Sequence, residues 1–548
     1  MMPWLLNTAW MAACLPEARR FRQAMRRVAS TQAELLGSIL RANRNTAFGQ
    51  RHNFAAIASP HDYQQRVPLS DYAAFAADIA RIGTGGTNVL THEKVDLLEP
   101  TSGTTGGEKL IPFTASLRTQ FQRALAAWMF DLLAHRPALR RGRAYWSISP
   151  TFAAPRQTAG GIPIGFDDDA AYLGRATQWM VRHLLAVPND VAKAPSLDAF
   201  RYQTLLHLLA AEDLTLISIW SPTFLLALFS PLEAWADRLC HDTALPTARR
   251  TAVQFILLSR HSLAEKLARL WPHLALISCW TDAGAARYVP ALTALFPHVE
   301  LQPKGLLATE GCVSFPLLAY AAPALALRSH FFEFQEAADP ARVRLAHELD
   351  RGGRYRVVLT TAGGLCRYQL HDEIDIIDFA DQCPLLRFVG KADGTSDLVG
   401  EKLAEPHVRA AIDALTRGHG LAPSFALLVP ATDPPHYRLY LQDAALAPAD
   451  LPALEKELEA ALSQNPHYAY ARRLTQLAPL QIIMLNPRGV SAHALYEQHC
   501  VALGQRPGNI KPVALDRRPG WPEVFAPASL PHTSSAPVPP ATAAAQTP

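Results

Sequence analysis

A run of small and polar residues at positions 99–113, EPTSGTTGGEKLIPF, contains the residue types that bind phosphate. Its glycines permit backbone angles closed to other residues, and successive N–H groups in such a loop can converge on an anion. The residues that could hold phosphate are three glycines, three hydroxyl side chains and a lysine: Gly103, Gly106, Gly107, Ser102, Thr104, Thr105 and Lys109. The Walker spacing is absent, so composition leaves two interpretations open, a polyphosphate-binding loop and a plain surface loop.

Two later segments supply a hydroxyl and two carboxylates of the kinds found in nucleotide sites. In LLATEG, Thr309 offers a hydroxyl to a phosphate, and Glu310 offers a carboxylate to Mg²⁺, which prefers hard oxygen ligands. Taken alone, such a pair is more often a helix cap. In LCRYQLHDEIDI, Asp372 precedes an expected strand and could accept both hydroxyls of a ribose. A salt bridge between Arg367 and Asp372 is the competing interpretation.

Alternating helical and strand patterns surround these segments and predict an α/β fold. Apolar residues at helical spacing predict helices around 35–40 and 121–132. Runs rich in β-branched residues predict strands at 355–360 and 374–379. The polar stretch 388–403 has few bulky apolar residues and is interpreted as a joint between two domains, with an ordinary linker as the alternative.

After this stretch the pattern restarts as a small α+β unit. Its predicted elements are a helix at 406–418, strands at 425–429 and 437–441, a helix at 451–462 and a strand at 480–485. These patterns predict a large N-terminal domain at 1–392, a small C-terminal domain at 393–515, and a disordered Pro-, Ala- and Ser-rich tail at 516–548.

Composition and charge exclude several classes of function. The 548 residues are 49% hydrophobic and 18% charged, as in a globular protein of more than one domain. A net charge of +4 without a basic block gives no support for nucleic-acid binding. Seven scattered cysteines without a CxxC pair argue against a zinc site or a disulfide framework. The N-terminus lacks the basic region of a signal peptide, and prolines interrupt the longest uncharged stretch, so we expect a soluble, cytoplasmic protein without membrane contact.

The order of these segments resembles that of the acyl-adenylate-forming enzyme superfamily. Within it the chain resembles the bacterial members of the GH3 family, the acyl acid–amido synthetases named for auxin-responsive proteins. The resemblance extends to about residue 515, and its most specific segment is SGTTGGEKLIPFT at 102–114. The other collinear segments are NTAFGQRHNF (45–54), PLSDYAAFAADIARIGTGGTNVLT (68–91), GGIPIGFDDDAAYL (160–173), LWPHLALISCWTDAG (270–284) and VGEKLAE (399–405).

This resemblance implies a two-step ligase reaction that uses ATP and Mg²⁺. A small carboxylic acid attacks the α-phosphate of ATP to give an acyl-adenylate and pyrophosphate, and an amine, in this family an amino acid, then displaces AMP. Both steps develop negative charge on phosphate oxygens, which Mg²⁺, Lys109 and loop N–H groups would stabilise. The resemblance also implies a monomer whose large and small domains rotate about a hinge at Asp393.

Carried over position by position, the resemblance also assigns the site residues. Glu310, Lys109 and Lys511 would be catalytic, Glu310 as the metal ligand and Lys511 as a late lysine reaching the active site from the small domain. The nucleotide contacts would be Ser102, Gly103, Thr104, Thr105, Gly106, Gly107 and Lys109 at the β- and γ-phosphates, Thr309 at the α-phosphate, Asp372 at the ribose, and Asp282, Gly284 and Ala285 beside the adenine.

Several positions depart from the family pattern. The usual YRYRVGD is CRYQLHD at 366–372, and the replaced positions are Cys366, Gln369 and His371. Asp372 is retained, so ribose binding stays the expectation, although His371 leaves less room beside it than glycine would. Leu306 replaces a common adenine-stacking tyrosine, and Lys391 replaces an arginine, which removes a bidentate contact.

Two aromatic segments, YWSISPTF (145–152) and SIWSPTFLLALF (218–229), resemble family segments that border the acyl pocket. Trp146 and Trp220 are the candidate pocket residues, with ordinary core packing as the alternative for each. Arg143 and Arg156 are candidate partners of the substrate carboxylate.

Two other functions remain open at this stage. An acyl-adenylate ligase that transfers the acyl group to a thiol, of coenzyme A or a carrier protein, would share the first half-reaction. A catalytically inactive protein that keeps the fold as a binding module would fit the departures at 366–372.

Overall fold

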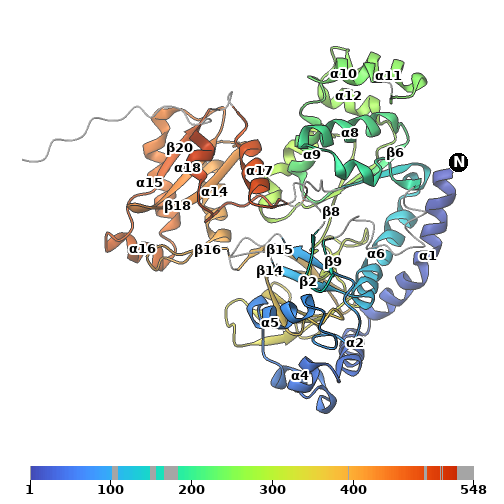
Figure 1. Cartoon of the computed structure of the whole chain (residues 1–548). Helices are drawn as coiled ribbons and strands as arrows, with labels where there is room; N and C mark the ends of the chain where they lie inside the picture. Colours follow the sequence, from blue (N-terminus) through green and yellow to red (C-terminus); the bar gives the residue numbers. More distant parts are fainter. Residues whose placement is uncertain are drawn as a thin grey trace, which may run out of the picture. The chain divides into compact units, whose positions relative to one another are not determined.

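The computed structural model describes residues 2–101, 109–147, 156–165, 183–242, 244–392, 394–486, 490–505, 508 and 510–526. Their contacts divide the chain into two compact units, which Figure 1 traces by colour along the sequence. Unit 1 comprises Met1–Thr395 with Cys500–Val513, and unit 2 comprises Ser396–His499 with Ala514–Pro548. The boundary expected after residue 392 stays a prediction about domains, while these contacts assign 500–513 to unit 1.

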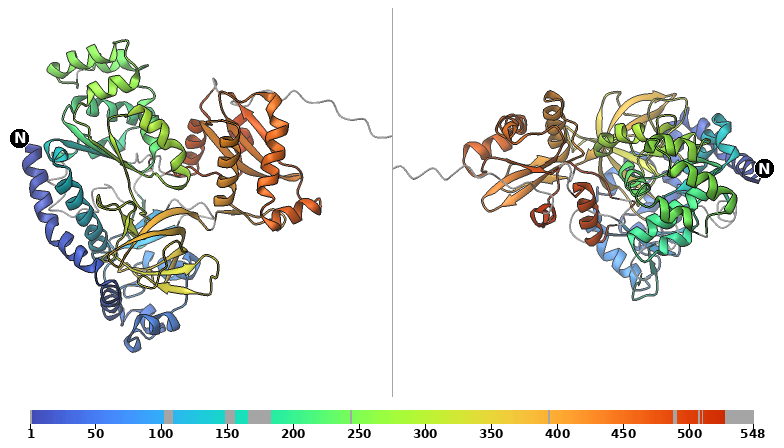
Figure 2. Two further views of the ribbon diagram at one scale, coloured as in Figure 1. Left: turned by 180° about the vertical axis from the view of Figure 1, so that it is seen from behind. Right: turned by 90° about the horizontal axis from the view of Figure 1, so that it is seen from above.

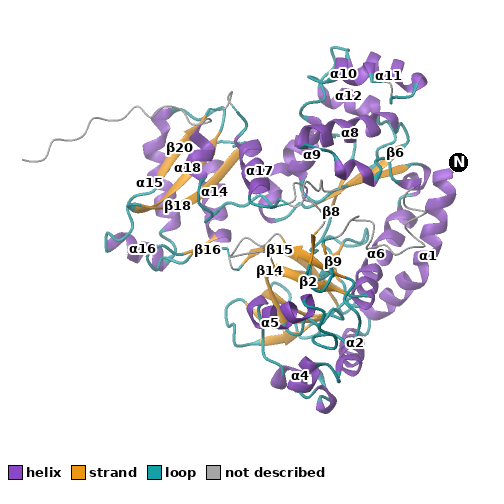
Figure 3. Cartoon of the chain, in the orientation of Figure 1, coloured by secondary structure: helices purple, strands orange, loops and turns teal. Residues whose placement is uncertain are grey.

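In the described part of unit 1, three sheets form the framework (Figure 3). An antiparallel sheet has the order β12 (Val343–Leu345), β11 (Phe331–Glu336), β13 (Arg354–Thr360), β14 (Tyr368–Ala380), β15 (Cys383–Lys391), β10 (Ala324–Leu325), β9 (Ser314–Phe315). A parallel sheet has the order β3 (Arg143–Trp146), β6 (Leu214–Ser218), β7 (Leu276–Cys279), β8 (Glu300–Pro303). A mixed sheet has the order β2 (Lys109–Phe113), β1 (Leu97–Thr101), β5 (Pro163–Ile164), β4 (Arg156–Gln157). The predicted strands at 355–360 and 374–379 are therefore confirmed as parts of β13 and β14.

Amphipathic helices cover these sheets. The helices of unit 1 are α1 (Met2–Met25), α2 (Val28–Asn43), α3 (Ala47–Arg51), α4 (Pro60–Arg66), α5 (Tyr72–Gly83), α6 (Ala115–His135), α8 (Leu197–Ala210), α9 (Pro222–Phe229), α10 (Ala236–His241), α11 (Thr247–Leu257), α12 (Leu263–Leu270) and α13 (Val289–Leu295). The apolar spacing read at 35–40 and 121–132 lies on α2 and α6, where most of these residues are buried. Thr114 begins α6, because its side chain accepts a hydrogen bond from the N–H of Leu117.

The parallel sheet is the element that positions the candidate site. Every residue of β6 and β7 is buried, as expected for parallel strands with helices on both faces. Side chains of α8 and α9 share one apolar core with β6, and the three views place these helices beside the sheet (Figure 1, Figure 2). All four strands end at the same edge, which is where open α/β sheets bind ligands.

Unit 2 is a small three-stranded sheet with helices, as its sequence pattern predicted. Its sheet has the order β18 (Phe425–Thr432), β19 (Pro435–Gln442), β20 (Gln481–Leu485). Its helices are α14 (Glu405–Gly418), α15 (Leu451–Leu462), α16 (Pro466–Arg473), most of α17 (Ala492–Ala502), and α18 (Trp521–Phe525). The short strands β16 (Thr395–Ser396) and β17 (Leu403–Ala404) pair with each other.

One correction concerns the expected tail at 516–548. Residues 516–526 are ordered and include α18, because Trp521 and Phe525 bury their rings against aromatic side chains of unit 2. The remainder, 527–548, lies outside the described residues. All seven cysteines are buried free thiols. No helix in the described part of the chain is long and apolar enough to cross a membrane.

Candidate active site

A tight loop presents Thr309 and Glu310 beyond the end of the parallel sheet. Leu307 pairs with Cys312, and the N–H of Ala308 donates to the carbonyl of Gly311 at 3.0 Å. Glu310 is buried, and its Oε1 accepts a hydrogen bond from the Tyr368 hydroxyl at 3.3 Å. The pair is therefore the tip of a loop and not a helix cap.

The buried side chain of His330 holds this loop in place through a hydrogen bond to its backbone. The backbone N–H of Cys312 donates to His330 Nε2 at 3.1 Å, so Nε2 is unprotonated and the ring proton lies on Nδ1, which is 3.1 Å from Gln120 Oε1. Burial, with a smaller contribution from the nearby Arg123, lowers the pKa of His330 to about 3, so the ring is neutral at physiological pH. A Cβ on Gly311 would lie 2.8 Å from Nε2, which explains why glycine follows Glu310.

Asp372 lies on β14 and is 1% exposed. Its Oδ1 is 3.2 Å from Lys391 Nζ on the facing strand, and that ammonium also donates to the Leu370 carbonyl at 3.0 Å. His371, which stands where the family has glycine, adopts a left-handed φ of 59°. The His371 carbonyl accepts a hydrogen bond from the N–H of Ala392 at 2.7 Å, so the backbone keeps the turn that glycine would allow. Holding histidine in this left-handed conformation has a modest conformational cost.

Lys511 lies in unit 1, close enough to Asp372 and Glu310 to interact with them electrostatically. Its Nζ is 5.1 Å from the ring centre of Trp280 and 6.0 Å from that of Phe388. Burial lowers the pKa of Lys511; Asp372 and Glu310 oppose this shift, whereas Lys391 adds to it. The structure thus brings one lysine within electrostatic reach of both carboxylates that the sequence assigned to the site.

Close packing holds the Lys511 segment against the stretch expected beside adenine. A Cβ on Gly284 would lie 2.0 Å from the Pro512 carbonyl oxygen, so only glycine fits there. Asp282 precedes the 3₁₀ helix η5 (Ala283–Tyr288), which contains Gly284 and the buried Ala285. Burial raises the pKa of Asp282, although the Phe388 N–H and Arg387 favour its ionised form. The adenine contact itself stays a prediction.

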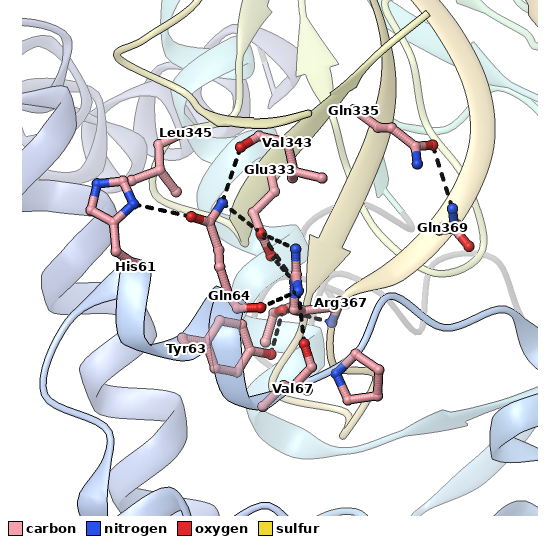
Figure 4. A network of polar contacts seen from close by, with 12 residues as sticks. His61, Tyr63, Gln64, Val67, Glu333, Gln335, Val343, Leu345, Arg367 and Gln369 are labelled. Carbon is pink, nitrogen blue, oxygen red and sulfur yellow. Dashed lines mark hydrogen bonds and ion pairs between the residues drawn. The ribbon is translucent and has the colours of Figure 1, made fainter. Parts of the chain in front are cut away.

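Arg367 does not pair with Asp372; the salt bridge considered from the sequence is wrong. Its guanidinium instead contacts Glu333, with Nε 3.1 Å from both carboxylate oxygens (Figure 4). Its Nη1 donates to the carbonyls of Gln64 and Val67 at 2.7 Å each. Burial raises the pKa of Glu333, and Arg367 opposes that shift. This network anchors the start of β14 and leaves Asp372 for another partner.

The loop expected to hold phosphate is only partly described. Lys109 begins β2 and pairs in register with Thr101 on β1, so the two strands form the arms of a hairpin. The Tyr72 hydroxyl accepts from the N–H of Leu110 at 2.9 Å and fixes one arm. The tip of the hairpin, Ser102 to Gly107, lies outside the described residues, as does Asp393, and their roles stay predictions.

The two candidate tryptophans lie at the edge of the parallel sheet, and both are partly accessible. The Trp220 ring packs on Trp280 with centroids 5.9 Å apart, and Trp146 packs on Trp10 at the same distance. Arg143 is engaged elsewhere, because its Nη2 is 2.7 Å from Asp213 Oδ1. The structure therefore gives Arg143 a structural partner, whereas Arg156 lies on the exposed strand β4.

Sequence reasoning missed Tyr368, His330, Trp280 and Lys304. Lys304 follows β8 and lies with Trp220 at the sheet edge. Its position directly after a strand of the parallel sheet places it at the ligand-binding edge, but no strand was predicted there from the sequence.

Solved structures share this architecture. The chain superposes on the GH3.15 acyl acid amido synthetase with a TM-score of 0.79 and 19% identity, covering 94% of this chain and 96% of that one. It superposes on AtGH3.15 in complex with 2,4-DB with a TM-score of 0.81 and 19% identity, covering 95% and 96%. The fold is therefore that of an acyl acid amido synthetase.

Sequence comparison specifies the family. Residues 17–301, 324–391 and 405–518 match the GH3 family N-terminal, central and C-terminal domains. The chain belongs to the GH3 family. It is 23% identical to the probable indole-3-acetic acid-amido synthetase GH3.1 of Arabidopsis thaliana, over 80% of this chain and 81% of that protein. It is 22% identical to the probable indole-3-acetic acid-amido synthetase GH3.2 of Oryza sativa subsp. japonica, over 90% and 92%.

Proposed function

We propose that this protein uses ATP to adenylate a small carboxylic acid and then transfers the acyl group to an amine, forming an amide. The observation that carries the proposal is the convergence of Glu310, Asp372 and Lys511. These three residues come from a loop, a strand and a late segment far apart in the sequence, and their charges influence one another. Membership of the GH3 family supports the same reaction, because the named relatives are amido synthetases.

Each residue has a distinct task in this proposal. Asp372 accepts hydrogen bonds from the ribose hydroxyls, since its carboxylate is buried and oriented by Lys391. Lys511 stabilises the negative charge that develops on the α-phosphate oxygens during both attacks, and its aromatic surroundings strengthen that interaction by excluding water. Lys109 and the loop after β1 hold the β- and γ-phosphates, and Thr309 contacts the α-phosphate.

The residues present fit a magnesium ion held mainly by the nucleotide. Mg²⁺ usually takes one or two carboxylates together with waters and substrate phosphates. Glu310 offers one such carboxylate at the loop tip, and no cluster of three His, Cys, Asp or Glu ligands occurs among the described residues. Bound there, Mg²⁺ would neutralise charge on the phosphate oxygens.

The acceptor is proposed to be an amino acid. This half of the proposal is supported by the two plant relatives and the GH3.15 structure described above, which are named amido synthetases. A monomeric, cytoplasmic enzyme is also proposed, and the seven buried free thiols support a reducing compartment. Rotation of the small domain about Asp393 would exchange the adenylating arrangement for the amide-forming one.

The test is pyrophosphate release from ATP and Mg²⁺ with a panel of carboxylic acids. Release with some acids is expected, followed by AMP and an amide when amino acids are added. Hydroxylamine, amino acids and coenzyme A, added separately, distinguish an amine acceptor from a thiol. Failure of every acid to release pyrophosphate, together with no rise in melting temperature on adding ATP and Mg²⁺, would reject the proposal in favour of an inactive binding protein.

A further inference from the structure

Lys304 occupies an unusual position for a lysine. It directly follows β8, and its backbone N–H donates to the Cys279 carbonyl at 3.0 Å. Its ammonium donates to Ser218 Oγ at 2.5 Å and lies over two indole rings, 4.9 Å from the centre of Trp220 and 5.5 Å from that of Trp128. Lys304 as a whole residue is partly accessible.

The ammonium lacks an anionic partner within the part of the chain that the structure describes. No ion pair forms there, and the hydrogen bond to Ser218 uses one of three N–H donors. Burial lowers the pKa of Lys304 to about 7. The titratable group facing it is the Cys279 thiol on β7, whose pKa is raised to about 12 by burial and which therefore supplies no negative charge at neutral pH. A desolvated cation without a counter-ion costs stability, which a functional use would explain.

The neighbouring strands direct further polar atoms to the same face. Trp146, Ser218, Ser278 and Gln302 are successive cross-strand neighbours, and Lys304 follows Gln302 by two residues, so all five side chains share one face of the sheet. The Ser278 hydroxyl is fully buried and has no hydrogen-bond partner among the described residues. A second unused polar group thus lies near the lysine.

An aromatic surface connects Lys304 with the adenylation residues. Trp220 packs on Trp280, Lys304 lies against the first ring, and Lys511 lies against the second. The two lysines therefore contact opposite members of one indole pair. An acid whose reacting carboxylate lies near Lys511 would extend along these rings towards Lys304.

We propose that Lys304 binds a second carboxylate at the far end of the acyl substrate, so that this enzyme acts on a planar dicarboxylic acid. The flat indole faces accommodate an aromatic or unsaturated body, and the ammonium with Ser218 receives the distal carboxylate. This inference rests on the proposed function, because it names the acid that the adenylating site would take.

The test compares two acids of similar shape, terephthalate and 4-methylbenzoate, which differ in the distal group. Binding is followed by quenching of tryptophan fluorescence without ATP, and turnover by pyrophosphate release. Charged hydrogen bonds contribute about 1.5–3 kcal/mol, so the wild type should prefer terephthalate by roughly 10- to 150-fold. Lys304→Met, which removes the charge and keeps an apolar stem, should abolish or reverse that preference. Lys266→Met is the control, because Lys266 is a buried lysine on α12 whose ammonium pairs with Glu233 at 2.6 Å.

The pH dependence provides an independent readout. Binding of the distal carboxylate requires the charged ammonium, so terephthalate affinity should fall as pH rises above about 7, while affinity for 4-methylbenzoate stays constant. A wild type that binds neither acid or shows no preference for terephthalate, or a Lys304→Met variant that keeps it, would overturn the inference while leaving pyrophosphate release with other acids intact. Lys304-dependent binding without pyrophosphate release from any acid would instead reject the proposed function and retain the carboxylate site.

Discussion

Two buried carboxylates of the same sheet provide a sharp test, because one is assigned to ribose binding and the other to structure. Asp372 and Glu333 are each 1% exposed, and each lies beside a cation. The cations differ: the Lys391 side chain is 40% exposed, whereas that of Arg367 is 6% exposed. We therefore compare Asp372→Asn with Glu333→Gln, two isosteric changes that each remove one negative charge.

The two variants are expected to differ in opposite ways: Glu333→Gln should lose stability, and Asp372→Asn should lose activity. A pair with a well-solvated partner contributes at most about 1 kcal/mol, so Asp372→Asn should change the melting temperature little. Loss of Glu333 leaves Arg367 charged and buried, which costs about 3–5 kcal/mol; the carbonyls of Gln64 and Val67 still accept from it, so the lower end is expected. For a unit of this size that corresponds to a fall on the order of 5 °C. By contrast, asparagine loses charged hydrogen bonds to ribose of about 1.5–3 kcal/mol each, which should lower kcat/KM for ATP by about 10²-fold.

The assay measures pyrophosphate release at varied ATP together with thermal melting of both variants. Glu333→Gln should melt lower and keep near-normal kcat/KM per folded molecule, and Asp372→Asn should melt normally and lose activity. If Asp372→Asn keeps the wild-type kcat/KM for ATP, or loses activity only in proportion to its stability, the ribose role is refuted.

Three further outcomes are expected. Because burial lowers the pKa of Lys511, pyrophosphate release should decline with rising pH earlier than an ordinary lysine would allow, and Lys511→Arg should extend activity to higher pH; an unchanged profile in the variant would contradict a role for its charge. Gly284→Ala, whose Cβ would meet Pro512, should displace the Lys511 segment and reduce adenylation at least tenfold, whereas Gly418→Ala, which meets nothing within 4 Å, should leave it unchanged; equal activities in a pyrophosphate assay would show that the segment moves freely. His330 is neutral when folded, with its pKa lowered to about 3, so stability should fall with acidification below its unfolded value near 6.5, by up to ~1.4 kcal/mol per pH unit; melting curves of His330→Gln should show a shallower acid slope, and an identical slope would argue against that linkage.

Local patterns predicted the elements well because each is encoded in neighbouring residues. The helical spacing of apolar residues predicted α15, in which Leu454, Leu458 and Leu462 are buried. The run of β-branched residues predicted β13. The tail prediction failed at 516–526 because the disordered composition begins later and Trp521 supplies enough apolar surface to anchor a short helix.

Contacts between side chains from different elements could not be predicted from the sequence. Arg367 and Asp372 are five residues apart, yet the arginine pairs with Glu333 on a different strand, since strand pairing decides which charges meet. The same limit hid Lys304, whose proposed role depends on Trp128 from α6 and on Ser218 and Trp220 from the end of β6 and the loop after it. The roles of Glu310 and Lys511 were predicted from a family resemblance, and their proximity became visible only in the folded chain.

The measurement that tests adenylation most directly uses a carboxylic acid labelled with ¹⁸O in both carboxylate oxygens. The enzyme, ATP, Mg²⁺, the labelled acid and an amino acid are incubated, and the products are analysed by mass spectrometry. If the carboxylate attacks the α-phosphate, one ¹⁸O is transferred to AMP when the amine displaces it, and the pyrophosphate stays unlabelled. Label in inorganic phosphate together with ADP, or an amide formed with unlabelled AMP, would contradict the account.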